Sequence, residues 1–212
     1  MAWLYLVTDR GLIGDRSLEE VVLGAVRGGV TMVQLREKEA STREFIDLAR
    51  RLLERLRPLG VPLIINDRVD VALAVGADGV HIGQQDMPYP IARRLLGPKA
   101  IIGLSVETLE ELQEAEAYDV DYLGISPVFP TPTKPDTRGA WGLEGLREAR
   151  RRSRHKLVAI GGIGPHNVRQ VLEAGAHGIA VVSAICAAPD PEEAAGLLRK
   201  EIDRFESGDQ DR

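Results

Sequence analysis

A chain of 212 residues, 44% of them hydrophobic, is long enough for one large core and contains no apolar run of the ~20 residues that a membrane span requires. Its formal net charge of −5 excludes sequence-independent binding to nucleic acid, which requires a basic surface. A single cysteine, Cys186, excludes an intrachain disulfide, and the N-terminal stretch lacks the features of a secretion signal. We therefore expect a cytoplasmic protein with no membrane or nucleic-acid partner.

Apolar runs and amphipathic segments alternate along the whole chain. Residues 3–8 predict the first strand, and Ser17 with Glu20 three residues later is the start signature of a helix over residues 17–27. Further strands are expected at residues 30–35, 61–65, 77–82, 100–104, 121–125, 157–160 and 179–182. Further helices are expected at about residues 42–56, 69–75, 89–96, 107–117, 142–152, 167–174 and 191–205.

Eight strand–helix units in a chain of this length predict a compact (β/α)8 TIM barrel of the α/β class. We expect one catalytic domain over residues 1–206, followed by a polar tail over residues 207–212. The alternative is a doubly wound open sheet, which has the same alternation. A dinucleotide-binding version of that sheet would need Gly-x-Gly-x-x-Gly after its first strand, and residues 9–14 do not provide it.

Two carboxylates follow neighbouring predicted strands: Asp67 comes after the third strand and Asp86 after the fourth. If the strands are parallel, both carboxylates leave the same edge of the sheet and repel each other unless a cation or a shared proton lies between them. Carboxylate oxygens with amides nearby suit Mg²⁺ that carries a substrate phosphate. The alternative for each Asp alone is that it caps the following helix.

Further polar residues stand at the other strand ends, which open on one face of a parallel barrel. Gln34, Arg36 and Lys38 end the second strand, Asn66 ends the third and Ser105 ends the fifth. Cations and hydroxyls that converge where helix N-termini also point predict an anion site bridged by a metal. For Arg36 the alternative is an ion pair with Glu37 or Asp67 that serves only as scaffold.

The longest loop, residues 126–138, contains the segment Thr131-Pro132-Thr133-Lys134. Loops of this length are usually lids, binding loops or disordered segments, and here the hydroxyls and the lysine can close over a phosphate. After the last two strands, Gly161-Gly162 and Val182-Ser183 predict the phosphate pocket that is usual in this fold, with backbone N–H donors. The alternative is that the glycines only form a tight turn.

The histidines do not form a metal set, so we interpret all of them as structural: His81, His155, His166 and His177.

Together these motifs resemble the thiamine-phosphate synthase family over essentially the full chain. The resemblance rests on residues 34–38, 66–67, 81–86, 103–105, 131–134, 160–163 and 182–185. Members of that family are transferases of thiamine biosynthesis. They join 4-amino-2-methyl-5-hydroxymethylpyrimidine diphosphate to 4-methyl-5-(2-hydroxyethyl)thiazole phosphate, or to its carboxylated form, and release pyrophosphate in a dissociative, Mg²⁺-assisted displacement.

The resemblance implies a role for each matching position. Asp67 and Asp86 would bind Mg²⁺, and Gln34 and Asn66 would recognise the pyrimidine. The diphosphate contacts would be Arg36, Lys38, Ser105 and Lys134. Of these, Arg36, Ser105 and Lys134 would also have catalytic roles. The contacts to the thiazole phosphate would be Thr131, Thr133, Gly162, Val182 and Ser183. Within the same motifs, the further substrate-binding positions would be Leu35, Glu37 and Pro132.

Two other functions remain open at this point. A thiazole tautomerase of the TenI type shares the fold and an Asn-Asp-Arg triplet like residues 66–68, but that group lacks the second metal Asp and carries a His in the loop after the sixth strand. This chain has Asp86, and Pro127 stands where that His would align. A non-catalytic phosphate-ligand sensor would not need both Asp residues and Lys134. The expected partners are small phosphorylated substrates, and the sequence is compatible with a homo-oligomer without requiring one.

Overall fold

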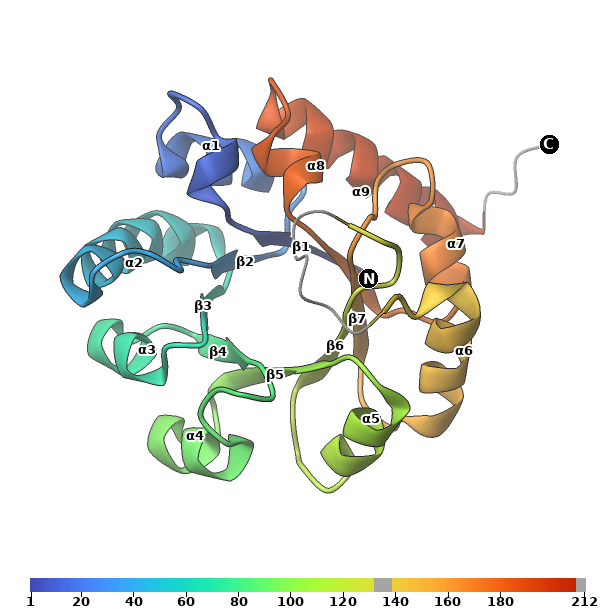
Figure 1. Cartoon of the computed structure of the whole chain (residues 1–212). Coiled ribbons are helices and arrows are strands. Elements are labelled where there is room, and N and C mark those ends of the chain that lie inside the picture. The colour runs from blue at the N-terminus through green and yellow to red at the C-terminus, as the bar shows by residue number, and fades with distance from the viewer. Residues whose placement is uncertain (132–138, 209–212) are drawn as a thin grey trace.

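In the computed structural model, which describes residues 1–131 and 139–208, eight parallel strands form a closed barrel in chain order (Figure 1). Closure is made by β8 and β1, where Leu4 lies opposite Ile179. The predicted TIM barrel is therefore confirmed, and the open doubly wound sheet is excluded. The strands are β1 (Trp3–Val7), β2 (Met32–Leu35), β3 (Leu63–Asn66), β4 (Gly79–Ile82), β5 (Ile101–Val106), β6 (Tyr122–Ile125), β7 (Leu157–Ile160) and β8 (Gly178–Val181).

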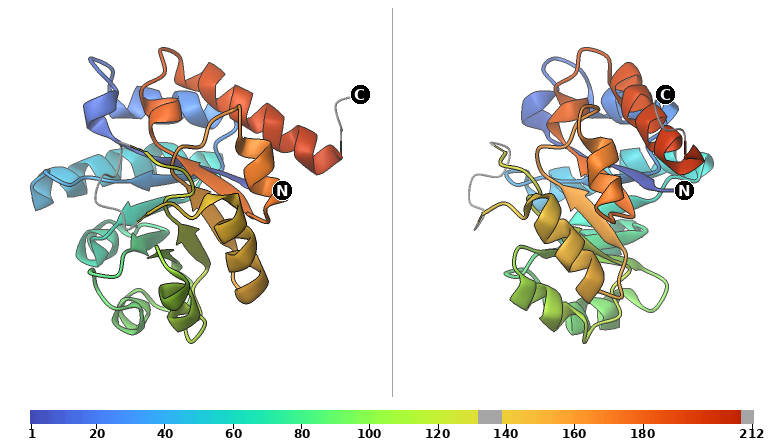
Figure 2. Two further views of the ribbon diagram at one scale, coloured as in Figure 1. Left: turned by 45° about the vertical axis from the view of Figure 1, so that its right-hand side comes forward. Right: turned by 90° about the vertical axis from the view of Figure 1, so that its right-hand side faces the viewer.

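Helices surround the strands on all sides, as Figures 1 and 2 show. The α-helices are α1 (Leu18–Arg27), α2 (Thr42–Leu56), α3 (Val69–Val75), α4 (Tyr89–Leu96), α5 (Leu109–Ala115), α6 (Gly142–Arg152), α7 (Val168–Glu173), α8 (Ser183–Cys186) and α9 (Pro191–Ser207). Two short 3-10 turns, η1 (Arg10–Leu12) and η2 (Arg57–Leu59), complete the described elements. No helix in the described part of the chain is both long and apolar enough to span a membrane.

Local sequence signals account for where several elements begin and end. The predicted capping box of α1 is present, because Ser17 accepts from the N–H of Glu20 and the Glu20 side chain accepts from the N–H of Ser17. Gly76 and Gly175 have φ of 66° and 105° in the turns before β4 and β8. This left-handed backbone explains why glycine recurs at these two equivalent turns.

The core has two layers. The larger layer lies between the barrel and the helices, and Leu35 and Phe45 both belong to it with 0% and 1% exposure. The smaller layer lies inside the barrel, where the buried side chains are Tyr5, Val7, Met32, Ile64, Tyr122, Val158 and Ala180. Because side chains on a strand alternate between these two layers, every second strand residue points into the barrel interior.

Most element bounds differ from the sequence-based expectation by one or two residues, and three differences are larger or bear on the site. The strand expected at residues 100–104 runs to Val106, because Ser105 and Val106 pair with Gly124 and Ile125 of β6. Ser105 is therefore a strand residue rather than the residue after a strand. The four-residue helix α8 follows β8 directly and was not predicted. The tail expected from residue 207 begins at the last residue of α9, and residues 209–212 lie outside the described part of the chain.

Candidate active site

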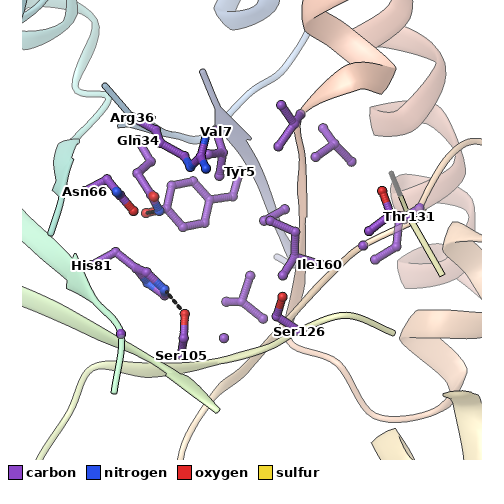
Figure 3. Close-up of a pocket in the computed structure, with 18 of the residues that line it drawn as sticks. Tyr5, Val7, Gln34, Arg36, Asn66, His81, Ser105, Ser126, Thr131 and Ile160 are labelled. Atoms are coloured by element: carbon purple, nitrogen blue, oxygen red, sulfur yellow. Dashed lines mark hydrogen bonds between the residues drawn. The ribbon is translucent and has the colours of Figure 1, made fainter. Parts of the chain in front are cut away.

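A cavity of about 870 Å³ opens at the carboxyl ends of the strands and reaches into the barrel. Figure 3 shows its two sides, with Gln34, Asn66 and His81 on one and Ile160 and Thr131 on the other. Most of the predicted site residues line this one cavity. They are Gln34, Arg36, Lys38, Asn66, Asp67, Asp86, Ser105, Thr131, Gly162, Val182 and Ser183.

The two carboxylates expected to share an edge do contact each other. Partial burial is the main reason why the pKa of Asp86 is raised, and contact with Asp67 raises it further, while the N–H of Gly83, 2.7 Å from Asp86 Oδ2, acts in the opposite direction. Neither residue caps a helix, because the N-cap of α3 is Arg68 and that of α4 is Pro88. The pair is therefore not explained by capping.

Asp67 also has an unusual backbone. Its φ is +62°, and no other non-glycine residue in the ranges 1–131 and 139–208 has a positive φ. The conformation is held by the Asp67 N–H, which donates to the carbonyl of His81 at 2.8 Å, and by the Asp67 carbonyl, which accepts from Val69 at 3.2 Å. Such strain concentrates at functional sites, and here it turns a carboxylate toward the cavity.

The donor set fits Mg²⁺ bound together with a substrate. Among the described residues, no cluster of three or more His, Cys, Asp or Glu side chains forms a complete metal cage. Mg²⁺ is commonly held by one or two carboxylates, with phosphate oxygens and waters completing its coordination. Asp67 and Asp86 supply those carboxylates, and a cation between them would relieve the repulsion that adds to the effect of burial on the pKa of Asp86.

The cations at the end of β2 are positioned separately. The N–H of Arg36 donates to the buried hydroxyl of Thr8 at 3.1 Å, which fixes the backbone there. Arg36 does not form the ion pair with Glu37 or Asp67 that was its alternative role. Glu37 pairs with Arg10 at 2.7 Å, and Asp67 pairs with Lys38 at 2.5 Å. Arg36 lines the cavity and is therefore placed for a ligand.

Not every residue of the β2 motif faces the cavity. Leu35 is fully buried in the outer core layer, and the side chain of Glu37 is 5% exposed and bound to Arg10. Neither belongs to the cavity lining, so the geometry does not favour their expected roles as substrate contacts. The reason is the alternation of a strand, which sends Gln34 and Arg36 inward and Leu35 outward.

On the opposite wall, glycine is required by the packing of two loops. Gly162 has φ +65°, and a Cβ at this position would lie 2.8 Å from Cβ of Phe129. Asn167 supports the turn, since its Nδ2 donates to the carbonyl of Gly162 and its Oδ1 accepts from the N–H of Gly164, both at 2.9 Å. The tight turn is thus real, and the additional phosphate role of Gly162 remains a prediction.

Three predicted site residues, Pro132, Thr133 and Lys134, lie outside the described part of the chain.

Known proteins with similar sequences decide the family. The family model described as thiamine monophosphate synthase matches residues 4–185. The thiamine-phosphate synthase of Albidiferax ferrireducens is 60% identical over 94% of this chain and 91% of its own length. This chain belongs to the thiamine monophosphate synthase family.

Other relatives agree with this family and with the fold. The thiamine-phosphate synthase of Syntrophomonas wolfei is 57% identical over 93% of this chain and 94% of its own. Among solved structures, thiamine phosphate pyrophosphorylase from Pyrococcus furiosus matches with a TM-score of 0.88 at 44% identity and covers 96% of both chains. The sequence resemblance and the barrel are therefore supported together.

In this member of the thiamine monophosphate synthase family, the floor of the cavity is formed by residues that sequence analysis did not assign. Tyr5, Tyr122 and His81 lie there, and His81 contacts the predicted site residue Ser105 at 2.7 Å. His81 and His166 both line the cavity, so the geometry does not favour a purely structural interpretation of these two residues, and their roles stay predictions. His155 and His177 keep structural roles, bonding to the carbonyl of Ala115 and to the N–H of Leu157.

The alternation of side chains along the strands contained the signal for these residues. His81 is paired in register with Asn66 on β3 and with Gly103 on β5, so it shares a level of the barrel with a predicted site residue. Apolar side chains also line the cavity, and they include Val7, Val158, Ile160 and Ala180. A cavity lined by both apolar side chains and a few polar groups suits a small ligand that carries both kinds of group.

Proposed function

We propose that this chain condenses 4-amino-2-methyl-5-hydroxymethylpyrimidine diphosphate with 4-methyl-5-(2-hydroxyethyl)thiazole phosphate, or its carboxylated form, to give thiamine phosphate and pyrophosphate. One observation carries the proposal. The contacting carboxylates Asp67 and Asp86 face the same cavity as the cations Arg36 and Lys38, with the glycine turn at Gly162 across from them. This arrangement offers separate places for a diphosphate and a monophosphate within one cavity.

The first substrate would bind across the barrel mouth. Its ring would lie between the amides of Gln34 and Asn66, both nearly buried, and the side chain of Ile160. Its diphosphate would then reach Arg36 and Lys38. Asp67 and Asp86 would hold Mg²⁺, which when bound supplies positive charge to the leaving diphosphate.

The second substrate would be held through its phosphate. The backbone around Gly162, together with Val182 and Ser183, would bind that phosphate, with Thr131 beside them. Anchoring the phosphate keeps the thiazole near the reacting carbon, which replaces a bimolecular encounter with a local one.

The proposed chemistry is dissociative. The bond between the pyrimidine methylene carbon and the diphosphate oxygen breaks first, and its electron pair leaves with the diphosphate. The electron-rich aminopyrimidine stabilises the resulting cation, and the thiazole nitrogen then forms the new bond with its lone pair. Arg36, Lys38, Ser105 and, from the sequence, Lys134 would stabilise the diphosphate as its charge grows. No protein nucleophile is required.

A direct assay tests this function. The full chain is incubated with both substrates and Mg²⁺, and thiamine phosphate and pyrophosphate are measured together. We expect equal amounts of the two products, none when either substrate is omitted, and loss of both when a chelator removes the metal. Pyrophosphate release at the same rate with and without the chelator would exclude the metal proposal. Isomerisation of a thiazole without condensation would instead favour a tautomerase.

We also propose a cytoplasmic location, with which the buried free thiol of Cys186 is compatible.

A further inference from the structure

An unbroken chain of hydrogen bonds crosses the floor of the cavity and links two predicted substrate contacts. Nε2 of Gln34 donates to Oη of Tyr5 at 2.9 Å, and the hydroxyls of Tyr5 and Tyr122 lie 2.8 Å apart. Oη of Tyr122 is 3.0 Å from Nδ1 of His81, and Nε2 of His81 is 2.7 Å from Oγ of Ser105. Figure 3 shows the last contact, with His81 and Ser105 pointing at each other from neighbouring strands.

The surrounding strands leave room for this chain. A Cβ at Gly103 on β5 would lie 2.1 Å from Cζ of Tyr122, and a Cβ at Gly124 on β6 would lie 3.0 Å from Cε1 of His81. Any side chain at position 103 would therefore displace the Tyr122 ring. Glycine at these strand positions lacks a side chain to pack, and its presence here is explained by the rings that occupy the space.

Once Gln34 is the donor at one end, each group in this chain of hydrogen bonds can donate in only one direction. Tyr5 and Tyr122 are 1% and 0% exposed, and burial raises the pKa of both phenols, so each has one proton to give. Tyr5 accepts from Gln34, and its own proton must go to Tyr122, its other hydrogen-bond partner among the described residues. Tyr122 must then donate to Nδ1 of His81.

The same logic reaches the far end of the chain. An imidazole that accepts at Nδ1 carries its proton on Nε2 in the neutral form. Nε2 of His81 therefore donates to Oγ of Ser105, and the Ser105 hydroxyl keeps its own proton for a ligand. At the near end, one N–H of Gln34 Nε2 is donated to Tyr5, which fixes the orientation of the amide and leaves Oε1 as its acceptor.

We propose that Tyr5, Tyr122 and His81 are positioning residues that hold Gln34 as an acceptor and Ser105 as a donor toward the substrate. The donor and acceptor roles of the two ends are thereby linked, although they sit on different strands. Under the proposed function, on which this part rests, Gln34 accepts from the exocyclic amino group of the pyrimidine and Ser105 donates to an anionic diphosphate oxygen. The direction of these hydrogen bonds also explains why His81 does not activate Ser105 as a nucleophile. Nε2 of His81 already holds a proton and cannot accept the one on the Ser105 hydroxyl.

The tautomer of His81 tests the direction without any turnover. The full chain is labelled with ¹⁵N-histidine, and two-bond ¹H–¹⁵N spectra distinguish a proton on Nε2 from one on Nδ1. The His81 signals are assigned by their loss in His81→Asn. We expect the proton on Nε2, with and without Mg²⁺ and pyrophosphate, and a mixture of tautomers in Tyr122→Phe, which removes the donor to Nδ1. The proposal would be overturned by a proton on Nδ1 of His81 in the unmodified protein. It would also be overturned if Tyr122→Phe had the same tautomer populations as the unmodified protein.

Kinetics with a matched control test the consequence for the substrate. Tyr122→Phe keeps the ring that packs edge-on against Trp3 and Tyr5 and deletes only the hydroxyl. Tyr89→Phe also deletes a bonded hydroxyl, 2.6 Å from the carbonyl of Asp119, but on α4 outside the barrel. We expect Tyr122→Phe to lower kcat/KM for the pyrimidine substrate by about tenfold or more, with KM for the thiazole phosphate unchanged.

Tyr89→Phe should leave the kinetic constants unchanged, even if both variants unfold at a lower denaturant concentration than the unmodified protein. Equal kinetics in the two variants would mean that Tyr122 only stabilises the barrel and that the positioning role is wrong. Because the spectra require no activity, they remain decisive if the condensation assay fails, so failure of this proposal and failure of the proposed function are distinguishable.

Discussion

Lys38 and Asp67 form an ion pair, with Nζ 2.5 Å from Oδ2, beside the second carboxylate, Asp86. The ammonium group partly offsets the negative charge that the two carboxylates concentrate at this edge of the barrel. The Lys38 side chain is 52% exposed, and a pair so open to solvent contributes no more than about 1 kcal/mol. Lys38 can therefore leave Asp67 for a diphosphate at little cost when a divalent cation binds the carboxylates.

Replacing either carboxylate should separate catalysis from folding. Asp67→Asn and Asp86→Asn keep the shape and remove a charge, so we expect turnover to fall by orders of magnitude at limiting Mg²⁺. Asp86→Asn should melt at the same or a higher temperature, because repulsion from Asp67 is relieved. Asp70→Asn is the control, since Asp70 pairs with Arg68 and does not line the cavity. A near-normal rate in either site variant would remove the metal assignment.

The two phosphate sites should respond to different substitutions. Ser183→Asp places a negative charge against the proposed thiazole phosphate, so KM for that substrate should rise at least tenfold while KM for the diphosphate changes little. Ser183→Ala, which removes the hydroxyl without adding charge, should have a much smaller effect. If Ser183→Asp raised both KM values equally, the two substrates would have been assigned to the wrong sites.

Lys134 can be tested although it lies outside the described residues. A lysine is a compact point charge suited to a diphosphate oxygen whose charge grows as its bond breaks. Lys134→Ala should therefore lower kcat more than it raises KM for the diphosphate substrate, as measured by steady-state kinetics. Lys99→Ala, which removes a lysine that does not line the cavity, provides the comparison. A change of less than about twofold in Lys134→Ala would indicate a solvated lysine with no catalytic role.

Two glycines should respond in opposite ways to the same substitution. Gly103→Ala forces a methyl group onto the ring of Tyr122, so we expect a loss of about 1–3 kcal/mol in the free energy of unfolding. Gly196 lies within α9 with open space around it, and Gly196→Ala should gain about 0.5–1 kcal/mol through higher helix propensity. Denaturant unfolding of both variants measures the difference. A neutral Gly103→Ala would show that the barrel floor is not tightly packed.

The single thiol should be unreactive in the folded chain. Cys186 is fully buried, and burial raises its pKa to about 11, so almost no thiolate exists at neutral pH. A disulfide reagent at pH 7 should therefore react with Cys186 only after denaturant unfolds the protein. Rapid reaction of the folded chain would show that α8 opens readily.

The sequence alone was sufficient for the main strands and helices and for the polar strand-end residues that gather at one cavity, because these depend on local patterns. Apolar runs, caps and the length of the chain predicted the barrel, and a parallel barrel gathers its strand ends on one face. The pairing of Asp67 with Asp86 follows from the same rule, since each comes shortly after one of two neighbouring strands.

Only the tertiary structure decided which side chains point into the cavity. Leu35 and Glu37 stand between predicted site residues and face elsewhere, whereas Tyr122, which belongs to none of the motifs, faces inward. Tyr5 and Tyr122 are 117 positions apart in the chain and share a hydrogen bond. Their meeting depends on how the strands pair and on closure of the barrel, which are set by the packing of the whole chain and leave no local pattern in the sequence.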